Sequence, residues 1–154
     1  MAKAREDDVM LDGSGLRVAI IVSDFNREIT DGLLNGARVR LKLAKCEEIE
    51  VIRAPGAFEL PVLAAKAARA GWDAVVALGA VIEGETDHYG HIATQTAAGL
   101  MQASLDTGVP IGFGVLTVRD PEHAVARSQS GPGNKGAEAA EAALRTALTL
   151  RSLD

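Results

Sequence analysis

The residues best suited to chemistry lie in four short polar segments, each of which directly follows an apolar run. They are residues 23–26 (SDFN), 54–59 (APGAFE), 83–88 (EGETDH) and 117–119 (TVR). Together they supply carboxylates, an amide, hydroxyls, an aromatic ring and an imidazole. In an open parallel sheet, ligands bind beyond the carboxyl ends of the strands. If the four apolar runs are neighbouring strands, these segments therefore predict one shared small-molecule site.

His88 is the best candidate for proton transfer, because an imidazole gives and takes protons near neutral pH. It follows Gly84, Glu85 and Thr86 at a predicted strand-to-helix turn. Free backbone N–H groups and the positive end of the helix dipole favour an anion at such a turn, and a phosphate would fit. The alternative is that Gly84 to Thr86 form only a helix cap.

A metal site is a second interpretation of the same segment. His88 and His91 lie three residues apart on a predicted helix, with Glu85 and Asp87 nearby. No further ligand follows with convincing spacing, so acid-base chemistry is favoured over metal binding. His123 is expected to lie on the surface.

Phe25 is a candidate platform for stacking a planar ring. The chain has only one Trp, one Tyr and three Phe residues, and Phe25 stands among polar neighbours at the end of a predicted strand. The alternative is that Phe25 folds back onto the following helix as a hydrophobic staple.

Two glycine-containing motifs do not support nucleotide binding. The segment around Lys135 (GNKG) lacks the leading glycine spacing and the Ser or Thr of a P-loop. The GFG motif around Phe113 lies inside an apolar run and not at a strand-to-helix turn, so it is not a dinucleotide fingerprint.

The elements that must position these residues alternate between strands and helices. Nearly continuous aliphatic runs are typical of parallel strands covered on both faces. Segments with helical spacing lie between them, and the last helix carries a Glu141–Arg145 pair. This alternation predicts a three-layer α/β/α sandwich with a flavodoxin-like parallel sheet. The expected strands are 17–23, 48–53, 72–82 and 109–118, and the expected helices are 29–41, 62–70, 91–105, a short one from Pro121, and 137–150.

Length and composition indicate one domain at residues 16–154, preceded by a flexible arm at residues 1–15. No apolar run is long enough for a membrane span or a signal peptide, so we expect a cytoplasmic protein without a membrane partner. The net charge of −5 argues against nucleic acid as a partner. The single cysteine, Cys46, is expected to be a small buried or half-buried residue.

Five motifs in this order, SDFN, PGAFELP, GAVIEGETDHY, GFGVLT and GNKGAEAA, resemble the lumazine synthase family from about residue 17 to residue 150. The resemblance implies a transferase of riboflavin biosynthesis that needs no cofactor. Such an enzyme condenses 5-amino-6-(D-ribitylamino)uracil with 3,4-dihydroxy-2-butanone 4-phosphate to give 6,7-dimethyl-8-ribityllumazine, the penultimate step of the pathway.

The resemblance also implies roles for individual residues. His88 would move protons, and the remaining residues would bind the substrates. Within one subunit, Phe25 would stack on the pyrimidine. The ribityl chain would be held by Asn26, Ala57 and Glu59, and the uracil edge by Val81 and Ile82. The phosphate would be bound by Gly84, Glu85 and Thr86. From the adjacent subunit, Phe113 would close the pocket, Arg127 would clamp the phosphate, and Lys135 would help to orient the substrates.

The same resemblance implies a homo-oligomer, either a pentamer or an icosahedral capsid of 60 subunits built from pentamers. The arm, through residues 9–11, would add a strand to the sheet edge of a neighbouring subunit. A non-catalytic flavin- or lumazine-binding protein, or a shell protein on the same scaffold, is the alternative function. Departures from the common family pattern occur at Asp24, at residues 53–54 and at residues 89–91.

Overall fold

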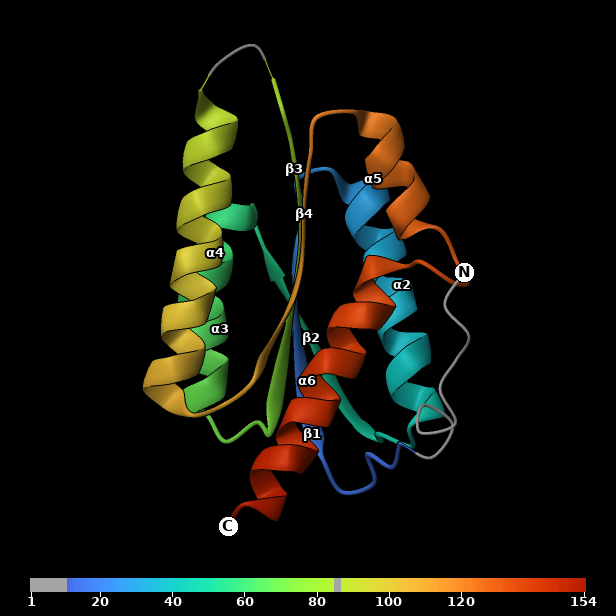
Figure 1. The fold of residues 1–154 in the computed structure, drawn as a ribbon, viewed down its shortest axis with the longest axis vertical. Helices are drawn as coiled ribbons and strands as arrows, with labels where there is room; N and C mark the ends of the chain where they lie inside the picture. Colours follow the sequence, from blue (N-terminus) through green and yellow to red (C-terminus); the bar gives the residue numbers. More distant parts are fainter. Residues whose placement is uncertain (1–10, 85–86) are drawn as a thin grey trace.

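The computed structural model describes residues 11–84 and 87–154. Its centre is a four-stranded sheet in the order β2-β1-β3-β4, in which every pair of neighbouring strands is parallel. Figure 1 shows this sheet edge-on, with helices on both sides. The strands are β1 (Arg17–Ser23), β2 (Glu48–Ala54), β3 (Ala74–Ile82) and β4 (Ile111–Val118).

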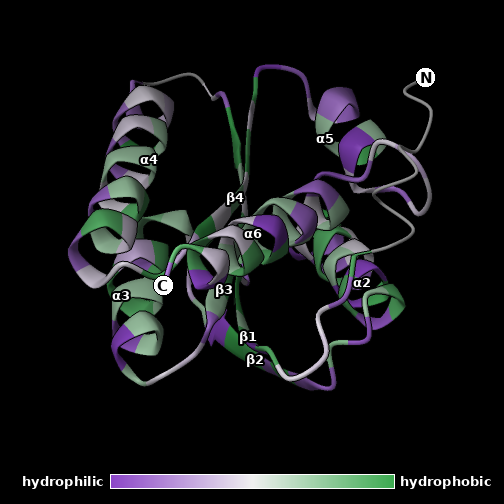
Figure 2. Ribbon diagram, turned by 60° about the horizontal axis from the view of Figure 1, so that its bottom comes forward, coloured by the Kyte–Doolittle hydropathy of each residue, from purple (hydrophilic) through white to green (hydrophobic). Residues whose placement is uncertain are grey.

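The inner strands are buried on both faces, as their aliphatic runs predict. In β1, Val18 and Ile20 face one core, whereas Ala19 and Ile21 face the other. This alternation follows from the two-residue period of a strand. Figure 2 shows hydrophobic residues along the central strands, between the two layers of helices. The predicted α/β/α sandwich is therefore confirmed.

Two helical layers enclose the sheet (Figure 1). One layer holds α2 (Arg27–Leu43), α5 (Pro121–Ser128) and α6 (Lys135–Ser152); the other holds a short 3-10 turn η1 (Ala57–Glu59), α3 (Leu60–Arg69) and α4 (His88–Thr107). The predicted boundaries need small corrections: α4 begins at His88 and not at 91, and β3 and β4 begin two residues later than predicted.

Close contact between α2 and α6 depends on Asn134. Its side chain is 2% exposed. The Oδ1 atom accepts the Ala137 N–H at 3.0 Å and caps α6, while Nδ2 donates to the carbonyls of Gly32, Ser128 and Gln129 at 3.0 to 3.2 Å. The GNKG segment thus joins three chain segments and has a structural use that the sequence did not indicate.

Glycines make this helix contact possible. A Cβ added at Gly36 would collide with the Asn134 side chain, and one added at Gly136 would collide with the Leu33 carbonyl. Both glycines lie inside helices, where glycine is unfavourable by about 1 kcal/mol relative to alanine. The close packing of α2 on α6 is the compensating gain.

The amino-terminal end of the described chain packs under the same helical layer. Leu11 lies against the core, and the Gly13 N–H donates to the carbonyl of Ala44. Cys46 is buried beside Gly13, which confirms the expectation for this residue. Burial raises the pKa of the Cys46 thiol above its ordinary value. Residues 9 and 10, to which a docking role was assigned, lie outside the described residues.

Among the described residues, no helix combines the length and the apolar character that crossing a membrane requires.

We predict that Asn134→Ala lowers the free energy of unfolding by about 2 kcal/mol, because it removes a helix cap and three partly buried hydrogen bonds. Urea denaturation measures this loss. Asp120→Ala is the matched control, since Asp120 caps α5 at an exposed position by accepting the Glu122 N–H at 2.9 Å, and it should cost about 1 kcal/mol or less. Equal losses in the two variants would contradict the role given to Asn134.

Candidate functional site

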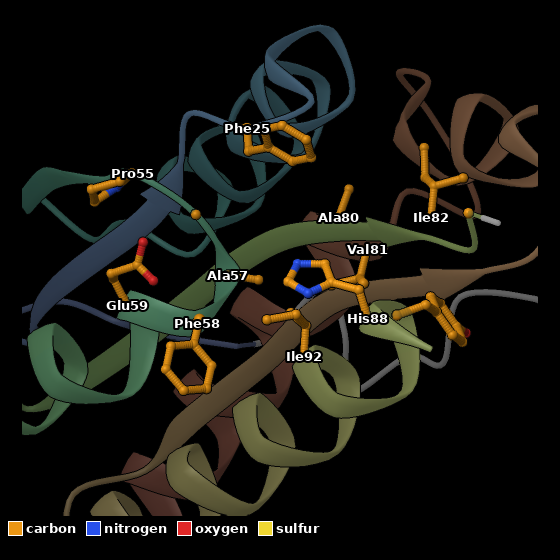
Figure 3. A pocket seen from close by; sticks show the side chains of 13 residues that line it. Phe25, Pro55, Ala57, Phe58, Glu59, Ala80, Val81, Ile82, His88 and Ile92 are labelled. Carbon is orange, nitrogen blue, oxygen red and sulfur yellow. The ribbon is translucent and has the colours of Figure 1, made fainter. Parts of the chain in front are cut away.

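A pocket of about 610 Å³ lies beyond the carboxyl ends of β1, β2 and β3. Its size is typical of a small-molecule site. Figure 3 shows its lining side chains, with Pro55 and Glu59 towards one end and Ile82 towards the other. The lining comes from the β1–α2 turn, the β2–η1 connection, the end of β3 and the first turns of α4: Phe25, Pro55, Gly56, Ala57, Phe58, Glu59, Ala80, Val81, Ile82, Gly84, His88, Tyr89 and Ile92.

Phe25 faces this pocket with 71% of its surface exposed. The staple alternative is therefore wrong, because a staple would bury the ring on α2. The backbone holds the residue in place: the Asp24 and Phe25 N–H groups donate to the carbonyls of Ala54 and Pro55 at 2.8 and 3.1 Å. An exposed, anchored aromatic ring in an apolar pocket suits the stacking of a planar ligand.

Asn26 lies next to the pocket but is not among its lining residues. Its backbone adopts a left-handed conformation (φ 60°) at the start of α2, which Asn tolerates better than most residues. Its Nδ2 donates to the carbonyl of Ala80 at 2.9 Å. The side chain thereby ties the turn that carries Phe25 to strand β3.

His88 is the first residue of α4 and reaches the middle of the pocket wall. Figure 3 shows its imidazole among the side chains of Ala57, Val81 and Ile92. An imidazole in such a place can exchange protons with a ligand bound beside it.

The anion-binding segment before α4 is described only in part. Gly84 lines the pocket, whereas Glu85 and Thr86 lie outside the described residues. In the part of the chain that is described, no three His, Cys, Asp or Glu side chains are grouped to hold a metal ion.

The turn η1 presents Ala57, Phe58 and Glu59 to the pocket. Buried Thr96 of α4 donates its hydroxyl to the Ala57 carbonyl at 3.3 Å and so connects the two walls. Glu59 is the single carboxylate on the described lining. It can accept hydrogen bonds from the hydroxyls of a polyol.

Three predicted site residues lie away from this pocket. Phe113, on β4, is 49% exposed. Arg127, on α5, donates to the His123 carbonyl at 3.2 Å, and Lys135, at the start of α6, pairs with Glu138 at 2.8 Å. His123 is exposed, as the sequence analysis expected. None of the three predicted residues lines the pocket of its own chain.

The fourth strand-end segment forms a separate hollow. Arg119 pairs with Glu83 at 3.4 Å, and both line a surface depression that also includes Asp87 and His91. Tyr89 borders this depression and the main pocket alike. The four strand-end segments thus share one edge of the sheet, but only three of them build the pocket.

Sequence reasoning missed several apolar lining residues. Ile92 could have been found, because it lies one helical turn after His88 and so shares its helix face. Phe58 lies between two predicted site residues, yet its direction depends on the 3-10 geometry of η1. Tyr89, noted above only as a departure from the common family pattern, also lines the pocket.

Comparison with known proteins gives a consistent result. The sequence model of the 6,7-dimethyl-8-ribityllumazine synthase family matches residues 15–151. A protein of that name from Kineococcus radiotolerans is 49% identical over 95% of this chain and 92% of its own length. One from Clavibacter michiganensis is 51% identical over 96% of this chain and 92% of its own length. The protein named 6,7-dimethyl-8-ribityllumazine synthase 1 from Caulobacter vibrioides is 50% identical over 89% of this chain and 92% of its own length.

Proposed function

The chain belongs to the 6,7-dimethyl-8-ribityllumazine synthase family, and on this premise we propose that the pocket at the ends of β1, β2 and β3 is its active site. The protein is a transferase that condenses 5-amino-6-(D-ribitylamino)uracil with 3,4-dihydroxy-2-butanone 4-phosphate in riboflavin biosynthesis. The products are 6,7-dimethyl-8-ribityllumazine, phosphate and water.

In this proposal, the pyrimidine ring stacks on Phe25. The backbone groups of Val81 and Ile82, at the end of β3, contact the uracil edge. The ribityl chain extends towards Ala57 and Glu59, whose carboxylate accepts hydrogen bonds from the sugar hydroxyls. Asn26, whose Nδ2 donates a hydrogen bond to the Ala80 carbonyl, supports this end of the site. These assignments are supported by the pocket's size and by the position of Phe25 and Glu59 on one lining.

The sugar phosphate takes the other end of the pocket, before the amino terminus of α4. Gly84, Glu85 and Thr86 receive its phosphate there, where the helix dipole favours negative charge. His88 then moves protons in three steps. The ring amine forms a Schiff base with the ketone and one water is lost, phosphate leaves by elimination, and the second amine closes the ring with loss of a second water. Holding both substrates together supplies most of the acceleration.

One observation carries the further proposal that two subunits share each site: in the described part of the chain, no Lys or Arg lines the pocket. A phosphate dianion is bound best by a paired cation. We propose that Arg127 of a neighbouring subunit clamps the phosphate, that Lys135 of that subunit orients the substrates, and that its Phe113 closes the pocket. On its own chain, each of these residues lies on an element outside the pocket.

The family is homo-oligomeric, and we propose a pentamer, or an icosahedral capsid of pentamers, in the cytoplasm. Three exposed apolar side chains on α4 and β4, namely Met101, Leu105 and Phe113, support burial against another copy. The arm at residues 1–15 would extend the sheet of a neighbour, next to the single domain at 16–154. A non-catalytic flavin-binding protein or a shell without activity is not favoured, because the relatives are named as synthases.

We predict a mass equal to a multiple of five chains, as measured by light scattering, and a smaller assembly after deletion of residues 1–10. This deletion spares Leu11 and Gly13, which pack on the chain's own core, so its effect reports on contacts between subunits. An unchanged mass after the deletion would refute the role of the arm, and a mass that is no multiple of five chains would refute the pentamer.

We predict that His88→Ala lowers kcat on the order of 100-fold without abolishing turnover, because substrate positioning remains. Arg127→Ala should instead raise the KM for the sugar phosphate by about tenfold or more, because a charge-assisted hydrogen bond is lost. Steady-state kinetics with both substrates separates the two effects. Arg151→Ala, at the end of α6, is the matched control for the loss of an arginine. Total loss of activity in both variants would contradict this division of roles.

We also predict that coexpressed His88→Ala and Arg127→Ala chains recover activity. In a random mixture, about a quarter of the interfaces combine an intact His88 with an intact Arg127 from the next subunit. At sugar phosphate concentrations well below the KM of Arg127→Ala, the specific activity of the mixture should therefore exceed the mean of the two separate variants. A mixture that never exceeds this mean would show that both residues act within one chain.

A further inference from the structure

Four charged side chains form a closed ring beside the pocket. Asp24 Oδ1 lies 2.7 Å from Arg53 Nε, and Asp31 Oδ1 lies 3.2 Å from Arg53 Nη2. Arg27 completes the ring through its contacts with Asp31 at 3.5 Å and with Asp24 at 3.8 Å. Because the charges alternate and sum to zero, every member has an opposite charge on both sides.

The ring connects three separate pieces of the chain. Asp24 lies in the turn after β1, Arg53 lies near the end of β2, and the other two members lie in the first turns of α2. Arg53 is the least exposed member, with 30% of its side chain exposed. Its planar guanidinium contacts both carboxylates, which is a geometry that lysine could not reproduce. The hydrogen bond to Asp24 raises the pKa of Arg53, so its guanidinium stays charged at neutral pH.

Phe25 follows Asp24 directly and has little packing of its own, since most of its surface is exposed. Its position therefore depends on the backbone on either side. On one side, the ring of four charged side chains holds Asp24 against β2. On the other side, Asn26 bonds the Ala80 carbonyl of β3. The turn that carries the aromatic platform is thus anchored to both neighbouring strands.

From this arrangement we infer that Asp24 and Arg53 are positioning residues, which act through Phe25 on the binding of the planar heterocyclic substrate. The inference rests on the proposed stacking role of Phe25 and extends it to residues that touch no substrate. It also explains two departures from the common family pattern, at Asp24 and at Arg53: in this chain they are partners in one ion pair.

Ion pairs that remain in contact with water contribute little to global stability, and the Asp24–Arg53 pair is only partly buried. The consequence of breaking this one should therefore appear in ligand binding more than in unfolding. The affected substrate should be the heterocycle, because the sugar phosphate binds at the opposite end of the proposed site.

The test compares Asp24→Asn, Phe25→Ala and the double variant in the full chain. Asp24→Asn should raise the KM for the ribitylaminouracil about threefold, with kcat and the KM for the sugar phosphate nearly unchanged. Phe25→Ala should raise the same KM by about tenfold, and the double variant should match Phe25→Ala alone. The binding of the lumazine product, followed by its fluorescence, gives the equilibrium counterpart.

Glu48→Gln is the matched control. Glu48 pairs with Arg17 at 2.9 Å between the same two strands, β1 and β2, but at their opposite ends. This variant should leave every kinetic constant unchanged. Thermal unfolding of all variants checks that the fold is intact, and Arg53→Lys should keep only part of the wild-type affinity because it retains the charge without the planar fork.

Three results would overturn the inference while leaving the role of Phe25 intact. They are an unchanged KM in Asp24→Asn, an equal change in Glu48→Gln, and an Asp24→Asn effect that persists undiminished when Phe25 is already alanine. A Phe25→Ala variant with unchanged binding of the heterocycle would overturn both the inference and the proposed stacking role.

Discussion

The parallel register of the sheet is the constraint on which the site depends. Because β1 pairs with both β2 and β3 in parallel, the chain leaves all three strands at one edge. Phe25, Ala57 and Gly84 follow these three ends, and His88 begins the helix that returns from the third. A pocket assembled in this way needs no long loop. Two of the three strands that hold its walls, β1 and β3, are buried on both faces, and β2 forms the edge of the sheet.

The described lining of one chain's pocket suits a flat, neutral ligand better than an anion. Its described lining offers aromatic and aliphatic surface, one imidazole and one carboxylate, but no cation. The cationic side chains proposed for the reaction lie on α5 and α6, across the sheet from α3 and α4 (Figure 1). Oligomerisation would then have a catalytic consequence, because the neighbouring copy supplies the charge that retains the phosphate.

Sequence reasoning predicted the fold and the polar segments that meet at one edge of the sheet, but it could not predict contacts between residues that lie far apart in the chain. Aliphatic runs predict β1 and β3 because burial on both faces leaves no polar alternation. The start of α4 was placed too late because Gly90 weakens the helical pattern. The Asp24–Arg53 ion pair could not be predicted from the sequence, since the two residues meet only through the register of β1 on β2. The role of Asn134 could not be predicted for a similar reason: its partners lie on α2, at the last residue of α5 and directly after α5.

The most direct measurement is an experimental structure of the assembled protein with the lumazine product and inorganic phosphate bound. The account predicts the heterocycle in van der Waals contact with Phe25, the ribityl chain near Glu59, and phosphate between the start of α4 and Arg127 of the partner subunit. A heterocycle bound elsewhere, or a phosphate held only by residues of one chain, would contradict it.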